Sequence, residues 1–249
     1  MKFLLVEFKK QKGQHSFFLF LLVFAFTVLW LLWCLDDLDF SRFNDVTGLL
    51  MTNLLLMNTI LLPLVLAVFA SRLADVERLG NTYKWLCTME SSACIYRCKA
   101  VVGTVYLSVF ALAQAALFAL TGNFFVPGFS IRYVQYFVTL LVVYEAVFLF
   151  QLNLSFASSS QLLPLFVSVG ATFTGIFSWF LNQYPLRYLI PWGYFAALCN
   201  VGMYYQEDIR YSTYTWSPYP VLWLVILLIF IGIEYLWGSR FFRKHVLDF

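Results

Sequence analysis

The sequence has 249 residues, of which 62% are hydrophobic and 12% are charged, and its formal net charge at pH 7 is +3. Soluble globular proteins carry about a quarter charged residues, so this composition excludes a water-facing globular protein and indicates an integral membrane protein. The sequence lacks the Gly-x-Ser-x-Gly, His-Glu-x-x-His and Gly-x-x-x-x-Gly-Lys-Ser/Thr motifs of hydrolases, metalloproteases and ATP-binding loops. We therefore expect no enzyme, no catalytic residue, no bound cofactor and no metal site in this chain.

The N-terminal segment MKFLLVEFKKQKG mixes apolar side chains with lysines. This pattern is typical of a short helix in the membrane interface whose basic face meets anionic headgroups, and we expect it to form an elbow before the first span. An unstructured basic tail is the alternative. The apolar run that follows is too long for a signal peptide and lacks small residues at its end, so we expect it to be retained.

Six apolar segments are long enough to cross a bilayer, which takes about 20 residues. They are Ser16–Cys34, Gly48–Phe69, Val101–Leu120, Tyr136–Phe156, Leu162–Leu181 and Val221–Gly238. Each is continuously apolar and does not alternate, so we expect helices and not the strands of a membrane barrel. The sequence thus predicts an all-α membrane protein, with one transmembrane domain over residues 1–249.

Lysine and arginine are unevenly distributed between the two sides of these spans. Apart from Arg42, Arg132, Arg187 and Arg210, all fall in the N-terminal segment, in the stretch between the second and third spans, or in the C-terminal tail. By the positive-inside rule, this distribution places both termini in the cytosol of a protein in the plasma membrane.

The first outer loop, from Asp36 to Asp45, contains several acids and one arginine. We expect an acidic patch on the outer face, which would attract a cationic ligand. The alternative is that these acids are tolerated there and cap helices. The acids in this loop that we take as candidates for a substrate pathway are Asp36, Asp37 and Asp39.

Some polar residues lie inside the spans. Glu145 is the one carboxylate near the middle of a span, where it costs about 2.5–3.5 kcal/mol. It either senses a proton or a cationic substrate, or it is a structural group that hydrogen-bonds to Gln114 or Asn58. Asn53 and Asn58 in the second span either pack helices together or line a translocation path. Glu145, Asn53 and Asn58 are therefore further candidates for the pathway.

The segment Asn182–Pro220, before the last span, is rich in tyrosine and tryptophan. Its apolar part, Leu189–Met203, is shorter than a span and contains Pro191 and Gly193. We therefore expect an interfacial or re-entrant helix on the outer side. Its aromatic residues predict an interfacial belt, with the lining of a substrate entrance as the alternative.

The charged stretch between the second and third spans reads SRLADVERLGNTYKWLCTMESSACIYRCKA. Within it, Ser71–Glu90 favours helix with a break at Gly80–Asn81, and a short helix is expected over Thr82–Leu86, capped by Asn81. Roughly thirty residues are more than two adjacent spans need, and long connections tend to be functional.

The run from Glu77 to Leu86, ERLGNTYKWL, is followed by Arg97 and Lys99 just before the third span. In this order the chain resembles the permeases of lantibiotic immunity transporters, which are membrane subunits of type-2 ABC exporters. The span PLFVSVGATFTGIFSWF, the outer IPWGY element and the closing Phe-Phe-Arg-Lys tail support a resemblance that covers essentially the whole chain. The proline usual in that family after the short helix is replaced here by Met89–Glu90–Ser91.

This resemblance implies a six-helix permease whose cytosolic coupling loop docks on a separate ABC ATPase dimer, which binds ATP and Mg²⁺. It also implies a second permease subunit, either a sibling or another copy, and the export or clearance of a lantibiotic or other cationic antimicrobial peptide for self-immunity or resistance. The alternatives are an exporter of a drug, a lipid or sodium, and a membrane sensor or accessory protein that transports nothing. No nucleic-acid partner is expected. The residues expected to contact the ATPase are Glu77, Arg78, Gly80, Asn81, Thr82, Tyr83, Lys84 and Trp85.

Overall fold

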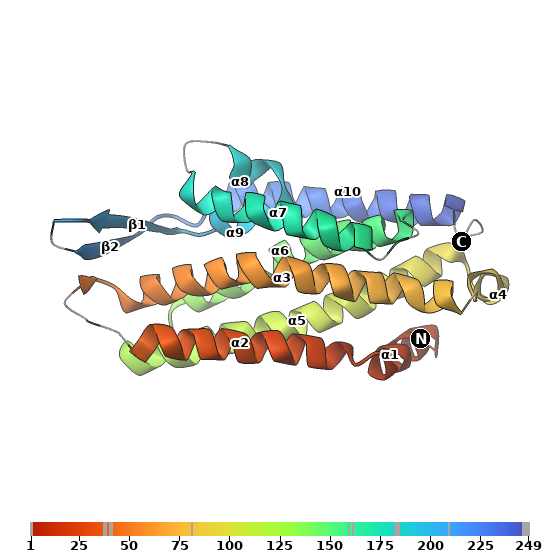
Figure 1. Ribbon diagram of the computed structural model, residues 1–249, viewed down its shortest axis with the longest axis horizontal. Coiled ribbons are helices and arrows are strands. Elements are labelled where there is room, and N and C mark those ends of the chain that lie inside the picture. The colour runs from red at the N-terminus through yellow and green to blue at the C-terminus, as the bar shows by residue number, and fades with distance from the viewer. Residues whose placement is uncertain are drawn as a thin grey trace.

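The computed structural model of the chain describes residues 2–36, 39, 42–80, 82–158, 160, 162–181, 185–208 and 210–245. Six helices are long and apolar enough to cross a membrane, which confirms the predicted all-α multi-pass architecture. They are α2 (Ser16–Asp36), α3 (Val46–Leu79), α5 (Ser92–Phe125), α6 (Ile131–Ala157), α7 (Leu162–Phe180) and α10 (Val221–His245). Each predicted span coincides with one of these helices, and Figure 1 shows them running along one another.

The two ends of this bundle carry different elements (Figure 1). The N-terminal helix α1 (Lys2–Gly13), the short helix α4 (Tyr83–Met89) and the last turns of α10 share one end, which we call the terminal end. At the opposite end, called the hairpin end, lie strands β1 (Val201–Gln206) and β2 (Tyr211–Trp216). An even number of spans brings the two termini to the same end.

Helices α3 and α6 form the centre of the bundle. Most of the apolar part of each is buried inside the protein, whereas α2 and α10 bury little of theirs. Aromatic rings join the central helices, and Phe69 of α3 lies 5.8 Å from Phe148 of α6 between ring centroids. Leu29 of α2 and Ile229 of α10 are exposed on the outside. Such apolar outer faces suit contact with lipid, because the backbone N–H and C=O groups of a helix are hydrogen-bonded within the helix.

The charged stretch between the second and third spans is mainly helical, as the sequence predicted for Ser71–Glu90. Helix α3 continues to Leu79 and α5 begins at Ser92, so that each has 34 residues. At 1.5 Å per residue each is about 50 Å long, well beyond a hydrocarbon core of about 30 Å. The break at Gly80 and the short helix are confirmed, but Thr82 precedes α4, and Asn81, the predicted cap, lies outside the described residues.

Helix α1 packs against α5 and α2, so the alternative of an unstructured tail is wrong. His15 adopts a positive φ of 55° at the turn from α1 into α2. Glu7 and Gln11 are fully buried, and the ring of Phe8 stacks on Tyr106 of α5 at 6.4 Å. The elbow is thus a packed part of the fold that turns polar side chains towards the other helices.

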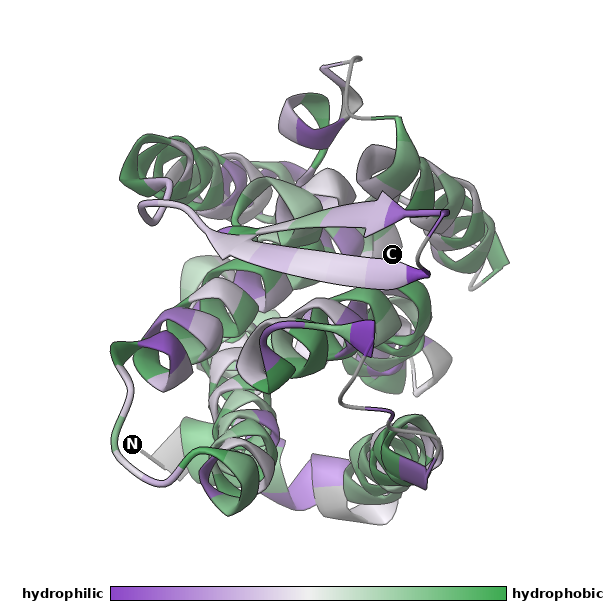
Figure 2. Cartoon of the chain, turned by 90° about the vertical axis from the view of Figure 1, so that its left-hand side faces the viewer, coloured by the Kyte–Doolittle hydropathy of each residue, from purple (hydrophilic) through white to green (hydrophobic). Residues whose placement is uncertain are grey.

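The segment before the last span folds as three short turns and a hairpin, where the sequence predicted a single interfacial or re-entrant helix. The turns are α8 (Leu186–Leu189), η2 (Pro191–Gly193) and α9 (Tyr194–Ala197). Pro191 interrupts the helix because its ring removes a backbone donor, and Ile190 before it is extended. The hairpin is antiparallel and its residues are rich in strand-forming tyrosine, threonine and valine. Figure 2 shows it lying across the ends of the helices.

The hairpin is fixed to the start of α3. Backbone N–H and C=O groups of Tyr214 both bond to the side chain of Asn44, at 2.7 and 2.9 Å. Tyr214 also packs on Gly48, where an added Cβ would lie 2.8 Å from the Cβ of the tyrosine. Tyr214 and Trp192, which the sequence assigned to an interfacial belt, are buried in the protein. These two rings therefore hold the hairpin end together.

Candidate functional site

Four charged side chains form a buried ion cluster at the terminal end. The Lys10 Nζ of α1 lies 2.7 Å from Oε1 of both Glu7 and Glu77. Lys99 of α5 pairs with Glu77, and its Nζ lies 3.6 Å from Oε2 of Glu7. Burial opposes the charged form of Lys10, yet its hydrogen bonds to Glu7 and Glu77 prevail and raise its pKa. Two acids balance two bases, so the cluster ties α1, α3 and α5 together without a net charge.

Glu77 and Tyr83 do not lie on a surface that an ATPase could reach, which corrects their prediction as direct contacts. Glu77 is about 1% exposed and its carboxylate is occupied by the two lysines of the cluster. The Tyr83 hydroxyl donates to the Ala74 carbonyl at 2.6 Å, and its ring meets Phe242 edge-on at 5.8 Å. Both side chains instead hold the turn and α4 against the bundle.

Arg78 faces the end of α6. Its guanidinium donates to the carbonyl oxygen of Ser155 at 2.9 Å and lies 3.2 Å from the Asp75 carboxylate. Arg78 thus joins the last turn of α3 to α6, and its charge is compensated within the chain.

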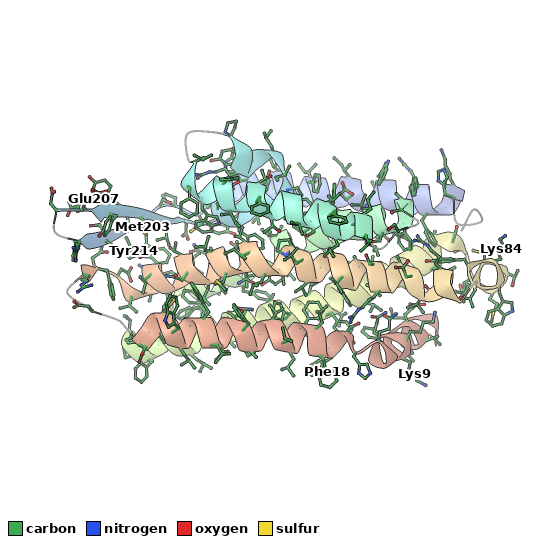
Figure 3. The ribbon with its side chains drawn as sticks, in the orientation of Figure 1. Lys9, Phe18, Lys84, Met203, Glu207 and Tyr214 are labelled. Carbon is green, nitrogen blue, oxygen red and sulfur yellow. The ribbon has the colours of Figure 1, made fainter. Side chains whose placement is uncertain are left out.

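The exposed face of α4 consists of Lys84, Trp85, Thr88 and Met89, and both Trp85 and Met89 are 63% exposed. Figure 3 shows Lys84 at the tip of the terminal end. Gly80 is also exposed and Thr82 is half-buried, whereas Asn81 lies outside the described residues. Further exposed cations at this end are Arg97, Arg240, Arg243 and Lys244. A large aromatic ring beside basic side chains is a common composition for a protein contact.

At the hairpin end, Asp45 has a structural role. It caps α3 by accepting from the N–H groups of Thr47 and Gly48, and it also accepts from Trp216 Nε1 at 2.5 Å. Arg132 lies 3.4 Å from the same carboxylate and 3.8 Å above the Trp216 ring. Burial tends to raise the pKa of Asp45, but the hydrogen bonds from Thr47 and Trp216 outweigh it and lower that pKa. For this residue the helix-capping alternative is correct.

Without Asp45, the predicted acidic patch consists of the other acids of the first outer loop. Asp36 and Asp39 are exposed, and Asp39 forms an ion pair with Arg42 at 2.9 Å; Asp37 lies outside the described residues. The structure adds two acids that the sequence analysis did not include, because Glu207 and Asp208 are exposed at the hairpin turn. Figure 3 places Glu207 at the far tip of the hairpin.

Glu145 and Asn58 make contacts other than those expected. Glu145 accepts from the Thr104 hydroxyl at 2.8 Å, and not from Gln114 or Asn58. The Asn58 side chain accepts from the Tyr144 hydroxyl at 2.6 Å and also reaches Tyr136. Asn58 therefore serves the packing of α3 against α6, which is the structural alternative.

A cavity of about 460 Å³ opens at the hairpin end, between α3, α7 and the hairpin, and we call it the hairpin-end cavity. Its wall is formed by Thr52, Asn53, Leu56, Ser178, Trp179, Phe180, Arg187, Ala196, Cys199, Val201, Gly202, Met203, Tyr214 and Ser217. Of the predicted pathway residues, Asn53 alone belongs to this wall. Sequence reasoning missed Arg187, although it was one of the few arginines assigned to the outer side.

The family model described as "ABC-2 family transporter protein" matches residues 3–175, which is more than half of the chain and runs from α1 into α7. No curated protein is similar enough to the chain to count as a relative.

Proposed function

The chain belongs to the ABC-2 transporter family and is the membrane-spanning permease subunit of an ABC transporter, and we propose on this premise that it clears a cationic antimicrobial peptide, such as a lantibiotic, from the membrane. Family membership implies an ABC ATPase partner and a place in the membrane. The peptide substrate is proposed from the resemblance to lantibiotic immunity permeases and from the charge of the hairpin end. ATP and Mg²⁺ would bind to the ATPase, and a sibling or a second copy would complete the permease.

The proposal of a peptide substrate rests mainly on the acidic side chains that are exposed at the hairpin end. Asp36, Asp39, Glu207 and Asp208 are all exposed there, against the exposed Arg42 and Arg210. Asp45, by contrast, is withdrawn into the fold by Trp216 and Arg132. Exposed acids raise the local concentration of a cationic ligand through long-range attraction. This favours a cationic peptide over an anionic substrate at that surface.

The ATPase would dock on the exposed face of α4. Lys84, Trp85 and Met89 are accessible, and the ion cluster behind them fixes α1, α3 and α5 as a rigid base. A helix held at the tip of two long spans is mechanically suited to pass a displacement of the ATPase into α3 and α5. On this proposal Glu77 and Tyr83 act as positioning residues behind the contact.

This proposal requires the terminal end to face the cytosol. In a variant without its native cysteines, Glu207→Cys should react in intact cells with a maleimide that cannot cross the membrane, and Lys84→Cys should react only after lysis. The positive-inside rule is the physical reason, since the basic side chains gather at the terminal end. The reverse labelling pattern would overturn the orientation and the docking proposal together.

The peptide function is tested in a sensitive strain that expresses the chain with its ATPase and sibling permease. The inhibitory concentration of a cationic lantibiotic should rise, and peptide bound to cells should move into the medium. Replacing Asp36, Asp39, Glu207 and Asp208 by their amides should reduce protection, and more so at low salt, because exposed charges are screened beyond about 10 Å at 0.1 M. Glu90→Gln, which neutralises an exposed acid at the terminal end, is the matched control.

A different result would redirect the assignment. If the complete transporter protects against no lantibiotic but changes the export of a drug, sodium or a lipid, the peptide substrate is wrong while the permease role stands. If the chain shows no association with any ABC ATPase and moves nothing, the alternative of a membrane sensor or accessory protein is favoured.

A further inference from the structure

The hairpin-end cavity contains a cation that the described part of the chain does not compensate. Arg187 lies on α8 in the cavity wall, and no acidic side chain lies within 4.0 Å of it among the described residues. Its Nε is buried without a hydrogen-bond acceptor among the described residues, and its Cζ lies 6.0 Å from the centroid of the Tyr188 ring. The adjoining residues 182–184, which the structure does not describe, are Asn, Gln and Tyr, so none is an acid.

The fold holds Arg187 in this position through a close backbone contact. An added Cβ at Gly193 would lie 2.7 Å from the Cα of Arg187 and 2.9 Å from its carbonyl oxygen, so this approach requires glycine. Tyr188, the next residue, stacks on Trp223 of α10 at 3.7 Å. Arg187 is half-buried, and leaving its buried Nε without an acceptor is unfavourable, so a site held by this backbone contact indicates an anionic ligand that completes it.

Three hydroxyl groups in the wall of the cavity are available as hydrogen-bond acceptors. The hydroxyls of Thr52, Ser178 and Ser217 donate to the carbonyl oxygens of Gly48, Thr174 and Asn200 at 2.9, 2.8 and 3.1 Å. Their hydrogens are therefore in use, and their lone pairs remain to accept from a ligand. A ligand that fits the wall thus combines one anionic group for Arg187 with hydroxyl or similar donors beside it.

The rim of the cavity is apolar. Phe180 and Met203 both line it, and they are 71% and 59% exposed. Trp179 lies in the wall, and Tyr188, next to Arg187, stacks on Trp223; aromatic rings of this kind are typical of the headgroup region of a bilayer. Polar walls below an exposed apolar rim match a molecule with a polar head and an apolar tail.

We propose that the hairpin-end cavity binds the headgroup of an anionic phospholipid of the phosphoglycerol type, with the phosphate on Arg187 and the acyl chains along Phe180 and Met203. The phosphodiester supplies the anion, and the glycerol hydroxyls supply donors to Thr52, Ser178 and Ser217. Phosphoethanolamine fits less well, because no acid among the described residues lines the cavity to balance its ammonium group. The proposal is independent of the peptide substrate, and its failure leaves the peptide assignment standing.

Binding is measured with the purified transporter complex in detergent, by titrating short-chain phosphatidylglycerol and following tryptophan fluorescence and native mass. Short-chain phosphatidylethanolamine and phosphatidylcholine serve as lipid controls, and glycerol phosphate and inorganic phosphate test the headgroup alone. We expect phosphatidylglycerol to bind at least about tenfold more tightly than the other two lipids. Arg187→Gln should weaken it by about tenfold or more, the loss expected for a charge-assisted hydrogen bond.

Matched variants separate the parts of the site. Arg210→Gln removes an exposed arginine at the same end and should leave the affinity unchanged. Phe180→Ala should weaken binding of the lipid but not of glycerol phosphate, whereas Ser178→Ala should weaken both. Unfolding temperatures of all variants, measured without lipid, identify any that fail to fold.

Two outcomes would overturn the proposal. One is equal affinity of folded Arg187→Gln and the natural chain for phosphatidylglycerol. The other is displacement of the fluorescence signal by a peptide with a free C-terminal carboxylate but not by its amidated form, with no response to phosphatidylglycerol. The second result would assign the cavity to a peptide carboxylate.

Discussion

At the terminal end, Lys10 and Lys99 lie against Glu7 and Glu77, whereas at the hairpin end Arg187 lines a cavity with no acid among the described residues that surround it. The terminal end neutralises its buried cations within the chain, whereas the half-buried Arg187 at the hairpin end has no acidic partner among the described residues. A self-neutralised cluster fixes helices relative to one another. An uncompensated cation in an open cavity has no such structural function. On the proposals made above, this difference separates an end that fixes the helices behind the ATPase contact from an end that binds a ligand.

The sharpest test of this contrast removes one cation at each end. Lys99→Met leaves Glu7 and Glu77 with Lys10 alone, and breaking a buried pair typically costs about 3–5 kcal/mol. Arg187→Met should leave the free energy of unfolding nearly unchanged, because Arg187 forms no ion pair with another described residue. Unfolding of the solubilised protein by heat or denaturant measures both. The exposed Lys84→Met controls for loss of a lysine at the terminal end, and equal effects of Lys99→Met and Arg187→Met would remove the distinction.

The next test separates positioning from contact at the terminal end. Trp85→Ala should weaken binding of the ATPase by about 2 kcal/mol, or roughly thirtyfold, because a large exposed aromatic ring is a typical hot spot. Its stability should stay the same, since Trp85 is 63% exposed. Trp33→Ala at the hairpin end, where the ring is 61% exposed, is the matched control. Copurification and direct affinity measurement check the result, and unchanged binding would exclude α4 as the main contact.

A smaller effect is expected at Asp45, the acid of the hairpin end that serves structure. Asp45→Asn should lower stability by about 1 kcal/mol, in the range for a weakened helix cap. Because the folded-state pKa is lowered, the contribution of Asp45 is present above its unfolded pKa of about 3.9 and is lost as the pH falls through the folded value. Unfolding measured from pH 7 to pH 3 should show a flatter acid limb for the variant. The exposed Asp36→Asn should keep the slope of the natural chain.

The smallest effect is expected at the surface ion pair of the hairpin end. Asp39→Asn breaks the pair with Arg42, but both side chains are largely exposed, so stability should change by less than about 0.5 kcal/mol and even less at high salt. Melting temperatures at low and high salt check this. A loss comparable to that of Lys99→Met would show that charges at both ends serve the same structural purpose.

The sequence was sufficient for features that depend on a short stretch of chain. The six spans follow from the need for about 20 apolar residues to cross a bilayer, and each predicted segment matches one helix. The break at Gly80 and the short helix after it were also predictable, because turn residues act locally. The turn at Pro191 and the hairpin after it were not predicted, because a short apolar run such as Leu189–Met203 is compatible with either a helix or strands.

The roles of individual charged residues were decided by the tertiary structure. In the sequence, Glu77 lies in a charged stretch and was expected on the surface. In the structure it is buried, and Lys10 and Lys99 from two other helices neutralise it. In the sequence, Arg187 resembles any other arginine on the outer side, and it lines a cavity because α3, α7 and the hairpin come together there. Hydrophobicity, which fixes the spans, is a property of each segment alone. Whether a charge is neutralised or left open depends on partners far along the chain, and only packing brings those together.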